Sequence, residues 1–323
     1  MTIRGDGVAA YCCAHLLRAA GFRADLETAD RPKLPVILLG DQALTLIRDI
    51  FEQPNLFATA RRIRRRVVAW GRNAAPIELE HSAVIVSEEM LLDATRPHGV
   101  SASGRELSWK ILATRPLPPP SVEEHFGTRM ASATPITMNA GADSSSCWIE
   151  ALEDGWLFLT PGWLLSVGAQ AETLLARSQV VASEIFSCGT SSGTVAAHPR
   201  IASPSGAPGW LACGTAAMSF DPICGDGTAH AVREAILASA VIRALADGGC
   251  EEDLLAHYQQ RLTAGFRRHL LLCRRFYGTG GTDRFWNTEL EMTQRGIEWC
   301  DAHLSNHAGF RYQLRGLELE AIG

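Results

Sequence analysis

The sequence predicts an α/β protein made of a parallel-sheet nucleotide-binding domain, an inserted β-rich domain and a helical C-terminal region. Three observations support this prediction. Residues 2–27 have the spacing of a compact β–α–β unit with a glycine-rich turn. Short apolar runs typical of strands fill residues 116–207, which begin with a proline cluster. Helical spacing dominates from residue 229 onward.

The composition indicates an ordinary globular protein and excludes several classes of function. Hydrophobic residues make up 46% and charged residues 20% of the 323 positions. A net charge of −5 argues against nucleic acid as a ligand, because phosphate binding needs a basic surface. No apolar run reaches the length of a membrane span and no signal-peptide pattern follows Met1, so we expect a cytoplasmic protein without a membrane partner. Nine cysteines without a CxxC pair predict reduced, mostly buried thiols.

The first strand and helix are joined by Gly5-Asp6-Gly7, and Ala10 stands where a third glycine is often found. Glycines let the backbone approach a pyrophosphate closely, and the N–H groups and positive dipole end of the following helix favour an anion. The next strand ends at Glu27, whose carboxylate can accept the ribose hydroxyls of an adenosine. We interpret this unit as a dinucleotide site. The alternative is a tight strand–helix turn without a ligand.

The remaining elements follow from apolar spacing and from turn residues. Further strands are expected at residues 35–40, 67–70, 81–86, 111–113, 146–150, 156–159 and 180–186. Helices are expected at residues 42–51, 90–94, 229–246, 252–277 and 286–303. The arginine-rich run at 61–66 precedes a predicted strand and is interpreted as a solvent-exposed surface.

A second glycine-containing segment, residues 210–229, runs from an apolar strand through a small-residue turn into a helix. It contains Gly214-Thr215-Ala216-Ala217, Asp221-Pro222 and Gly225-Asp226-Gly227. This order resembles the late motif of the flavin-dependent halogenase and monooxygenase superfamily, whose fold is like that of para-hydroxybenzoate hydroxylase. The resemblance implies FAD as the cofactor, with its pyrophosphate on the first glycine turn. The alternative is a buried strand–turn–helix without a cofactor.

The resemblance also implies roles for individual residues of this segment. In such proteins the Asp-Pro turn lies along the isoalloxazine ring, and the N-terminus of the following helix faces the flavin O2 carbonyl. The residues implied to contact the ribityl chain or the ring are Gly214, Thr215, Asp221, Pro222, Gly225 and Gly227.

Other segments extend the resemblance over most of the chain. Gly40-Asp41 stands where halogenase-like proteins carry a turn near the flavin. Residues 155–161 are similar to the Trp-x-Trp-x-Ile-Pro signature of tryptophan halogenases, which makes Trp156 and Phe158 candidates for substrate binding. The implied organisation is a Rossmann-like FAD-binding domain at residues 1–115 and 208–240, a β-rich substrate domain at 116–207 and a helical C-terminal region at 241–323.

Two departures from the family pattern weigh against halogenation. The second tryptophan and the isoleucine of the signature are Phe158 and Thr160 in this chain. Residues 60–70, where a halogenase places its essential lysine, have only arginines as basic residues. A guanidinium is never deprotonated and cannot replace the chemistry of that lysine. We therefore expect a monooxygenase and not a halogenase.

Two further departures concern the affinity for FAD. Thr215 replaces the aspartate that normally follows the glycine at position 214. Residues 109–115 match the family's Asp-Ala-Thr-Gly-Arg turn only in part. Losing two polar anchors costs on the order of 1 kcal/mol each, so we expect weak or reversible FAD binding. Complete loss of the cofactor is the alternative.

The leading hypothesis is an FAD-dependent monooxygenase that hydroxylates an aromatic, tryptophan- or indole-like substrate. The substrate is either a small molecule or a tryptophan in a partner protein during quinone-cofactor maturation, as in the LodB/GoxB-like branch of the superfamily. No second dinucleotide motif is visible, so a separate flavin reductase is an expected partner. The second hypothesis is a degenerate flavoprotein that acts as a non-catalytic binding or maturation subunit. The third is a flavin-using dehydrogenase that adds no oxygen to its product.

The sequence identifies neither a catalytic acid or base nor a metal site. His81, His125 and Glu88 are interpreted as structural because nothing in the sequence places them near a flavin ring. A face of the last helix carries Cys300 and His303 with His307 beyond, but a fourth metal ligand is not evident.

Overall fold

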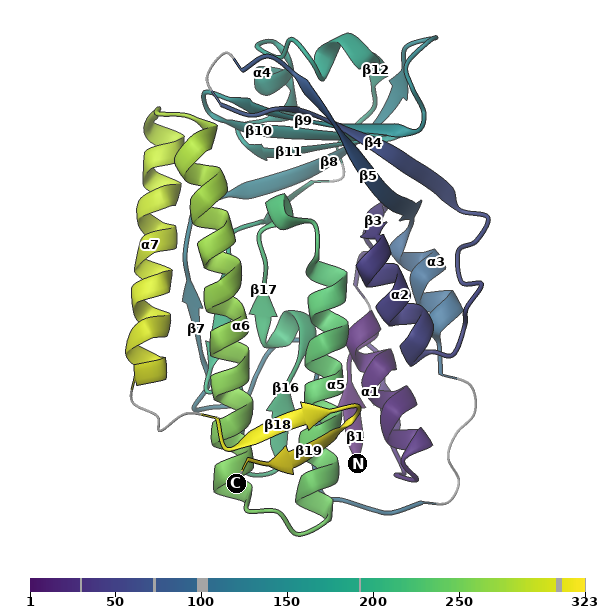
Figure 1. Ribbon diagram of the computed structural model, residues 1–323, viewed down its shortest axis with the longest axis vertical. Coiled ribbons are helices and arrows are strands. Elements are labelled where there is room, and N and C mark those ends of the chain that lie inside the picture. The colour runs from purple at the N-terminus through teal and green to yellow at the C-terminus, as the bar shows by residue number, and fades with distance from the viewer. Residues whose placement is uncertain (30, 72–73, 98–103, 192, 306–309, 323) are drawn as a thin grey trace.

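Two sheets, one stacked above the other, organise the chain (Figure 1). They are seen in a computed structural model that describes residues 1–323 except 30, 72–73, 98–103, 192, 306–309 and 323. Helices surround the lower sheet, and the upper sheet covers their upper ends. The predicted α/β class is confirmed.

The lower sheet has five strands and is mostly parallel. Its central strand β1 pairs in parallel with β2 on one side and with β6 on the other, and β16 pairs in parallel with β6. The strands, in their order across the sheet, are β15 (Gly206–Ala207), β16 (Trp210–Ala212), β6 (Lys110–Leu112), β1 (Thr2–Arg4) and β2 (Asp25–Glu27). The expected β–α–β unit therefore exists, although its second strand is shorter than residues 22–27.

Helix α1 (Val8–Ala19) begins directly after Gly7 and has a buried face of alanine, cysteine and leucine. It ends at Gly21, whose φ of 80° suits glycine and lets the N–H of Phe22 donate to the carbonyl of Leu17. Helix α5 (Gly227–Ala246) packs along α1, and eleven of its residues are buried. The two helices begin at the two glycine-containing segments singled out in the sequence.

The upper sheet has nine strands drawn from distant parts of the chain. Strand β4 pairs antiparallel with β5 and parallel with β9, which joins the N-terminal segment to the inserted one. Its strands are β3 (Ile37–Gly40), β4 (Arg61–Ala69), β5 (Ile77–Val86), β8 (Met130–Met138), β9 (Ser146–Leu152), β10 (Gly155–Thr160), β11 (Trp163–Gly168), β12 (Ile185–Cys188) and β13 (Thr194–Ala196). The domain division at residue 115 stays a prediction, since β3, β4 and β5 share this sheet with the inserted strands.

Two sequence-based assignments in this sheet need correction. Residues 61–66 do not precede a strand but form the first two thirds of β4, where Ile63 is fully buried among exposed arginines. Charged residues on the solvent face do not prevent a strand whose alternate face is packed. Residues 180–186 do not form one strand: a 3₁₀ turn at Ala182–Glu184 precedes β12.

The C-terminal helices form an antiparallel hairpin beside both sheets (Figure 1). Helix α6 (Glu251–Gly280) is followed at once by α7 (Arg284–Ser305). A Cβ atom at Gly280 would lie 2.2 Å from the ring of Trp286, so this tight connection requires glycine. The predicted helices at 252–277 and 286–303 are confirmed. A final hairpin of β18 (Tyr312–Arg315) and β19 (Glu318–Ala321) was not expected from the sequence.

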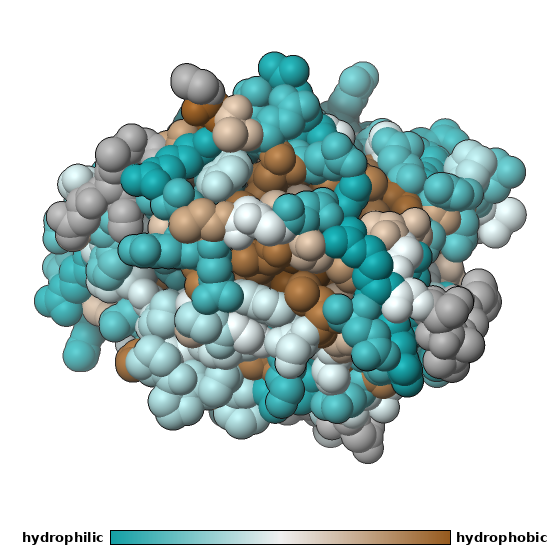
Figure 2. All heavy atoms as spheres, turned by 90° about the horizontal axis from the view of Figure 1, so that it is seen from below, coloured by the Kyte–Doolittle hydropathy of each residue, from teal (hydrophilic) through white to brown (hydrophobic). Residues whose placement is uncertain are grey.

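The remaining elements are short and connect the two layers. A three-stranded sheet joins two strands near the ends of the inserted segment to one that follows it: β17 (Met218–Ser219), β14 (Arg200–Ser203) and β7 (Val122–His125). The other helices are α2 (Asp41–Ile50), α3 (Glu88–Thr95) and α4 (Ala171–Leu175). Seen from below, hydrophobic residues show at the centre of the molecule within a hydrophilic surround (Figure 2). None of the described helices is long and apolar enough to cross a membrane.

Candidate functional site

A cavity of about 430 Å³ lies between the two layers. Its lower wall is made by the start of α1, the chain before and around the start of α5, and the chain before β3. Its upper wall is made by the inner face of β8, β10, β11 and β13. Both glycine-containing segments therefore meet the same cavity, although more than 200 positions of sequence separate them.

The first glycine turn forms one end of the lower wall. Gly5 has a φ of 142°, and a Cβ atom there would lie 3.0 Å from the Cβ of Ala113 and 3.5 Å from that of Ala10. Gly7 caps α1 without a side-chain hydrogen bond, and no acidic residue lies in the first turn of the helix. The N-terminal N–H groups of α1 thus face the cavity, which Gly7, Val8 and Ala9 line. Gly5 and Ala10 shape the turn from behind.

A cluster of charged side chains that the sequence analysis missed lies over this turn. The Arg31 guanidinium bonds Asp6 at 3.2 Å and Glu88 at 3.0 Å, and its Nη2 atom lies 3.3 Å from where a Cβ atom of Gly7 would be. Lys33 also forms an ion pair with Asp6. The hydrogen bond to Glu88 raises the pKa of Arg31. These residues lie far apart in the sequence, so no local pattern indicates the cluster.

Glu27, Gly40 and Asp41 lie outside the cavity lining. Glu27 is exposed at the end of β2, where its carbonyl accepts a 2.8 Å hydrogen bond from the N–H of Gly5. Gly40 ends β3, and the half-exposed Asp41 side chain lies 3.4 Å from Arg62. Only Glu27 is therefore next to the glycine turn.

The second segment approaches α1 at Gly214. A Cβ atom at Gly214 would lie 2.7 Å from the Cβ of Ala9, and its φ is 57°, so glycine is required by space and by conformation. Thr215 lines the cavity and is exposed within a buried segment. Its carbonyl accepts a hydrogen bond from Arg200. The residue that replaces the expected aspartate thus presents a neutral hydroxyl at the cavity wall.

A buried carboxyl group lies in the same wall, at Glu234 of α5. The residue is 5% exposed and lines the cavity, and its two carboxylate oxygens have no hydrogen-bond partner of normal geometry among the described residues. Burial raises its pKa well above the usual value, against the smaller opposing effects of the Gly214 amide and Arg200. No sequence pattern indicated this residue, because one acidic position in an amphipathic helix is common.

Hydrogen bonds from other parts of the chain hold the Asp-Pro turn in place. The Oδ1 atom of Asp221 accepts a 2.9 Å hydrogen bond from the N–H of Ile223, and its Oδ2 atom accepts a 3.0 Å hydrogen bond from the hydroxyl of Tyr277. The side chain of Asp221 is fully buried. Asp221 therefore shapes the turn, and both Asp221 and Pro222 line the cavity.

The glycines after this turn prepare the start of α5. Gly225 has a φ of 67° and ends the short 3₁₀ helix Pro222–Cys224. Gly227 begins α5, whose N-cap Asp226 makes no side-chain capping bond. Both glycines line the cavity. The cavity thus receives a second helix N-terminus with uncapped N–H groups.

A buried ion cluster fixes the turn to the C-terminal helices. The Arg129 side chain is fully buried between two equally buried carboxylates, with its Nε atom 2.7 Å from Asp221 and its Nη1 atom bonded to Glu289 of α7. The guanidinium lies 4.3 Å from the ring centroid of Tyr277 of α6. Glu289 also accepts a 3.0 Å hydrogen bond from the N–H of Thr128. Three separate parts of the chain therefore converge on Asp221.

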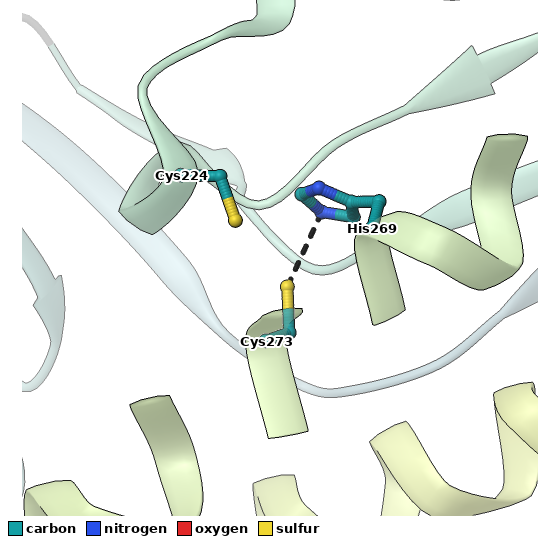
Figure 3. Close-up of side chains that lie close together, drawn as sticks. All are labelled: Cys224, His269 and Cys273. Carbon is teal, nitrogen blue, oxygen red and sulfur yellow. Dashed lines mark hydrogen bonds between the residues drawn. The ribbon is translucent and has the colours of Figure 1, made fainter. Parts of the chain in front are cut away.

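Two cysteines and a histidine meet just below this turn (Figure 3). The sulfur atoms of Cys224 and Cys273 and the Nε2 atom of His269 lie within 4.8 Å of one another. The Nε2 atom already accepts a 2.8 Å hydrogen bond from the N–H of Asp221 and lies 3.3 Å from the sulfur of Cys273. Burial lowers the pKa of His269 to about 3, so the ring is neutral. Its lone pair supports the backbone of the turn and is not free for a metal ion.

Among the described residues, Cys300 and His303 are not part of a candidate metal-binding group. Cys300 is fully buried, and the His303 ring stacks on Trp299 at 3.8 Å. His307 lies outside the described residues.

The upper wall carries the candidate substrate residues. Phe158 and Thr160 of β10 and Trp163 of β11 line the cavity. Trp156 lies on the same face of β10 as Phe158 but is 1% exposed and does not line the cavity. Its Nε1–H donates a 3.1 Å hydrogen bond to the hydroxyl of Tyr277. Trp156 therefore supports Tyr277 and, through it, the Asp221 turn.

Comparison with solved structures shows that this fold is like that of flavin-dependent halogenases and of a peptidyl tryptophan dihydroxylase. The predicted resemblance is confirmed at the level of the fold. No protein-family profile matches the sequence, and no curated protein matches it.

Three solved structures illustrate the likeness. One is described as the peptidyl tryptophan dihydroxylase QhpG, essential for tryptophylquinone cofactor biogenesis (TM-score 0.71, 17% identity, 99% of this chain and 85% of that chain). Another is CmlS, a flavin-dependent halogenase (TM-score 0.71, 15% identity, 94% and 70%). A third is HpxO from Klebsiella pneumoniae in complex with FAD and uric acid (TM-score 0.62, 16% identity, 94% and 96%). At such identities the likeness shows the fold.

Proposed function

We propose that this protein is an FAD-dependent monooxygenase that hydroxylates an aromatic substrate. The observation that carries the proposal is the single cavity onto which two uncapped helix N-termini and an apolar sheet face converge. The N-termini of α1 and α5 favour anionic or electron-rich groups, and the opposite wall favours a flat apolar one. The shared fold of FAD-dependent enzymes supports the same conclusion.

The residues present fit FAD. Gly7 with the N-terminus of α1 would hold the pyrophosphate, and Arg31, next to Gly7, would add a cation. Glu27 would accept the ribose hydroxyls, with Gly5 and Ala10 shaping the turn. Gly214 and Thr215 would face the ribityl chain. Pro222, Gly225 and Gly227 would face the ring, and Asp221 would hold their turn in shape. No role in the binding of FAD follows from the geometry for Gly40 and Asp41.

Bound FAD would supply the electrons and activate dioxygen. The chain would supply an apolar wall, on which Phe158, Trp163 and Leu165 would limit water and hold an aromatic ring. None of the described residues lining the cavity is a lysine, and Lys33 is paired with Asp6, which supports a hydroxylase over a halogenase. Proton transfer has no assigned residue.

The finer proposal is that the substrate is tryptophan- or indole-like and belongs to a partner protein. It rests on the fold shared with a peptidyl tryptophan dihydroxylase and on the apolar upper wall. A separate flavin reductase would provide the reducing equivalents, and the reduced cysteines suit a cytoplasmic protein. The proposed division of the chain keeps residues 1–115 and 208–240 as the FAD-binding part, 116–207 as the substrate part and 241–323 as the helical part.

The proposal is tested by titrating the purified protein with FAD while following flavin fluorescence. Saturable binding in the micromolar range is expected. Val8 lies at the start of α1 and lines the cavity, so Val8→Asp places a negative charge where the pyrophosphate would bind without opposing the helix dipole. Val8→Thr is the neutral control. Equal FAD affinity in both variants, or no binding by the unchanged protein at millimolar FAD, would overturn the proposal.

A second candidate function is a flavin-fold subunit that binds a partner without turnover. The observation that favours it is Thr215, which leaves the position of the family's aspartate without a carboxylate. The two functions differ in oxygen use. Stoichiometric consumption of dioxygen with hydroxylated product supports the monooxygenase, while partner binding without oxygen consumption supports the subunit.

A further inference from the structure

The upper sheet ends in an unusual edge beside the cavity. Strands β12 and β13 both pair with β8, one after the other, and no described strand lies outside them. From Ile185 to Ala197 the sequence contains no charged residue. Proteins normally protect sheet edges with lysine, proline or charge, because an open edge pairs readily with another chain. This edge lacks those protections.

The backbone of β13 is oriented to accept a further strand. The N–H of Ala197 donates a 2.9 Å hydrogen bond to the carbonyl of Arg129, and Val195 stands opposite Ala131 of β8. Hydrogen-bonded and non-hydrogen-bonded positions alternate in an antiparallel pair. The backbone groups of Thr194 and Ala196 therefore point away from β8, toward the open side.

The same strand forms part of the cavity mouth. Val195 lines the cavity and is 60% exposed, and Leu34 on the opposite rim lines it and is 54% exposed. Ala196 lines the cavity as well. On β12 the Phe186 side chain is 75% exposed. A chain that paired with β13 would thus lie across an apolar rim, with every second side chain directed to one side of the sheet.

Charge is distributed unevenly within the cavity. Its charged lining residues, Arg31, Glu88, Asp221 and Glu234, all belong to the lower wall. The upper wall is apolar except for Thr160. A free amino acid carries an ammonium and a carboxylate group, which this wall cannot pair, and burying unpaired charges is strongly unfavourable. An aromatic side chain within a polypeptide has no such charges.

We propose that the open edge of β13 docks an extended peptide by adding a strand to the upper sheet, and that the peptide directs one uncharged aromatic side chain into the cavity. This rests on the proposed function, since the cavity is where the substrate would react. Backbone hydrogen bonds to Thr194 and Ala196 position the peptide, and the apolar upper wall selects the aromatic ring. Free tryptophan is excluded by its two charges.

The test compares three probes by calorimetry on FAD-saturated protein. They are the uncharged peptide acetyl-Thr-Val-Trp-Val-Thr-amide, N-acetyl-tryptophanamide and L-tryptophan. The peptide is expected to bind roughly tenfold more tightly than the amide, and the amide roughly tenfold more tightly than L-tryptophan. If L-tryptophan binds as tightly as the amide, the inference that the cavity excludes the charged groups of a free amino acid is overturned.

A substitution at the edge of the sheet distinguishes two contributions to peptide affinity: pairing with β13 and insertion of the aromatic ring into the cavity. Thr194→Pro removes an outward N–H at an exposed position that does not line the cavity, whereas Thr194→Val keeps it. Thr194→Pro is expected to weaken the peptide roughly tenfold and to leave N-acetyl-tryptophanamide within about twofold, while Thr194→Val changes neither. Unchanged unfolding midpoints show that both variants are folded. Full peptide affinity in Thr194→Pro would overturn the docking strand.

The same titrations without FAD distinguish this inference from the proposed function. Peptide binding that is weakened by Thr194→Pro in a protein unable to bind FAD would retain the docking strand and reject the monooxygenase. FAD binding without peptide binding would retain the monooxygenase and reject the docking strand.

Discussion

Gly214 and Thr215 are neighbours with opposite consequences for the cavity. Gly214 allows α1 to approach, because any larger residue would meet Ala9. Thr215 lines the cavity from an otherwise buried segment, and it offers a hydroxyl where a carboxylate is expected. The glycine was recognisable in the sequence by its motif. The nearby carboxyl of Glu234 was not, because it reaches the same wall from a helix that follows in the sequence.

Thr215→Asp should tighten FAD binding. A charged acceptor strengthens hydrogen bonds to ribityl hydroxyls by about 1 kcal/mol, which is roughly a fivefold change in dissociation constant. Because residue 215 is exposed, the fold should tolerate the change. Fluorescence titration measures the effect, and Thr215→Asn is the uncharged control. An affinity no higher than that of the unchanged protein would show that the ribityl chain lies elsewhere.

Glu234→Gln should stabilise the protein, and increasingly so as the pH rises. The pKa of Glu234 is raised in the folded state, so its contribution to the free energy of unfolding is complete below the unfolded pKa of about 4.3 and is lost as the pH rises toward the folded value. Glutamine does not titrate and removes this loss. Urea unfolding from pH 5 to pH 8 should show a difference that grows to roughly 1–3 kcal/mol.

The control for that experiment is Glu252→Gln, an exposed position near the start of α6. If the difference in free energy of unfolding between the Glu234→Gln variant and the unchanged protein stays constant over this pH range, folding does not raise the pKa of the Glu234 carboxyl.

At the level of elements, the helical hairpin of α6 and α7 supports the Asp221 turn. Tyr277 of α6 and Glu289 of α7 reach it directly or through Arg129. The sequence predicted both helices from their apolar spacing and the Asp-Pro turn from its motif. It could not predict their contact, because helical periodicity shows which face is buried and not which partner covers it.

Arg129→Met should destabilise the protein by about 3–5 kcal/mol, because it leaves two buried carboxylates without their cation. It should also weaken FAD binding, since the Asp221 turn loses its support. Unfolding and FAD titration measure the two effects. Arg267→Met is the matched control: its ion pair with Asp301 joins the same two helices but is partly exposed, so a small effect is expected. Equal loss in both variants would contradict a special role for Arg129.

Strand assignments were good where the strand is apolar and buried and poor where the chain carries charge. Residues 83–86 at the end of β5 and residues 155–160 of β10 are mostly buried, and both strands were predicted in part. The start of β4 was missed because arginines fill its solvent face, and β18 and β19 were missed because they are short and half exposed. Pairing between β4 and β9 is long-range and has no local signal.

At the level of the whole molecule, the cavity lies between two layers, and the residues that line it from one layer are mostly distant in sequence from those that line it from the other. The lower layer supplies helix N-termini and the upper layer supplies the apolar wall. The sequence predicted these two halves separately, from the glycine turns and from the Trp156–Phe158 segment. Their enclosure of one cavity depends on strand order, which composition and periodicity do not determine.

A ligand that spans both layers should stabilise the whole chain. With FAD at one hundred times its dissociation constant, the free energy of unfolding should rise by about 2.7 kcal/mol and the midpoint of thermal unfolding by roughly 5 °C. Calorimetry measures both. The Val8→Asp variant should show little of this increase at the same FAD concentration. A rise of equal size in Val8→Asp would place FAD away from α1.

The order of strands also decides when the cavity can form as the chain is synthesised. Strand β6 can pair on its open side only after β16, one hundred residues later, has been synthesised. The Asp221 turn likewise gains its support only after Tyr277 and Glu289 have been synthesised. A ribosome-bound chain that has emerged only to residue 200 therefore holds the first glycine turn but neither α5 nor the support of the second turn. Such long-range closure makes folding slow. Capture of the proposed FAD would thus be a late event. All strands of the upper sheet have emerged by residue 200 but still lack α6 and α7 beside them, and such exposed apolar surface makes a nascent chain prone to aggregation.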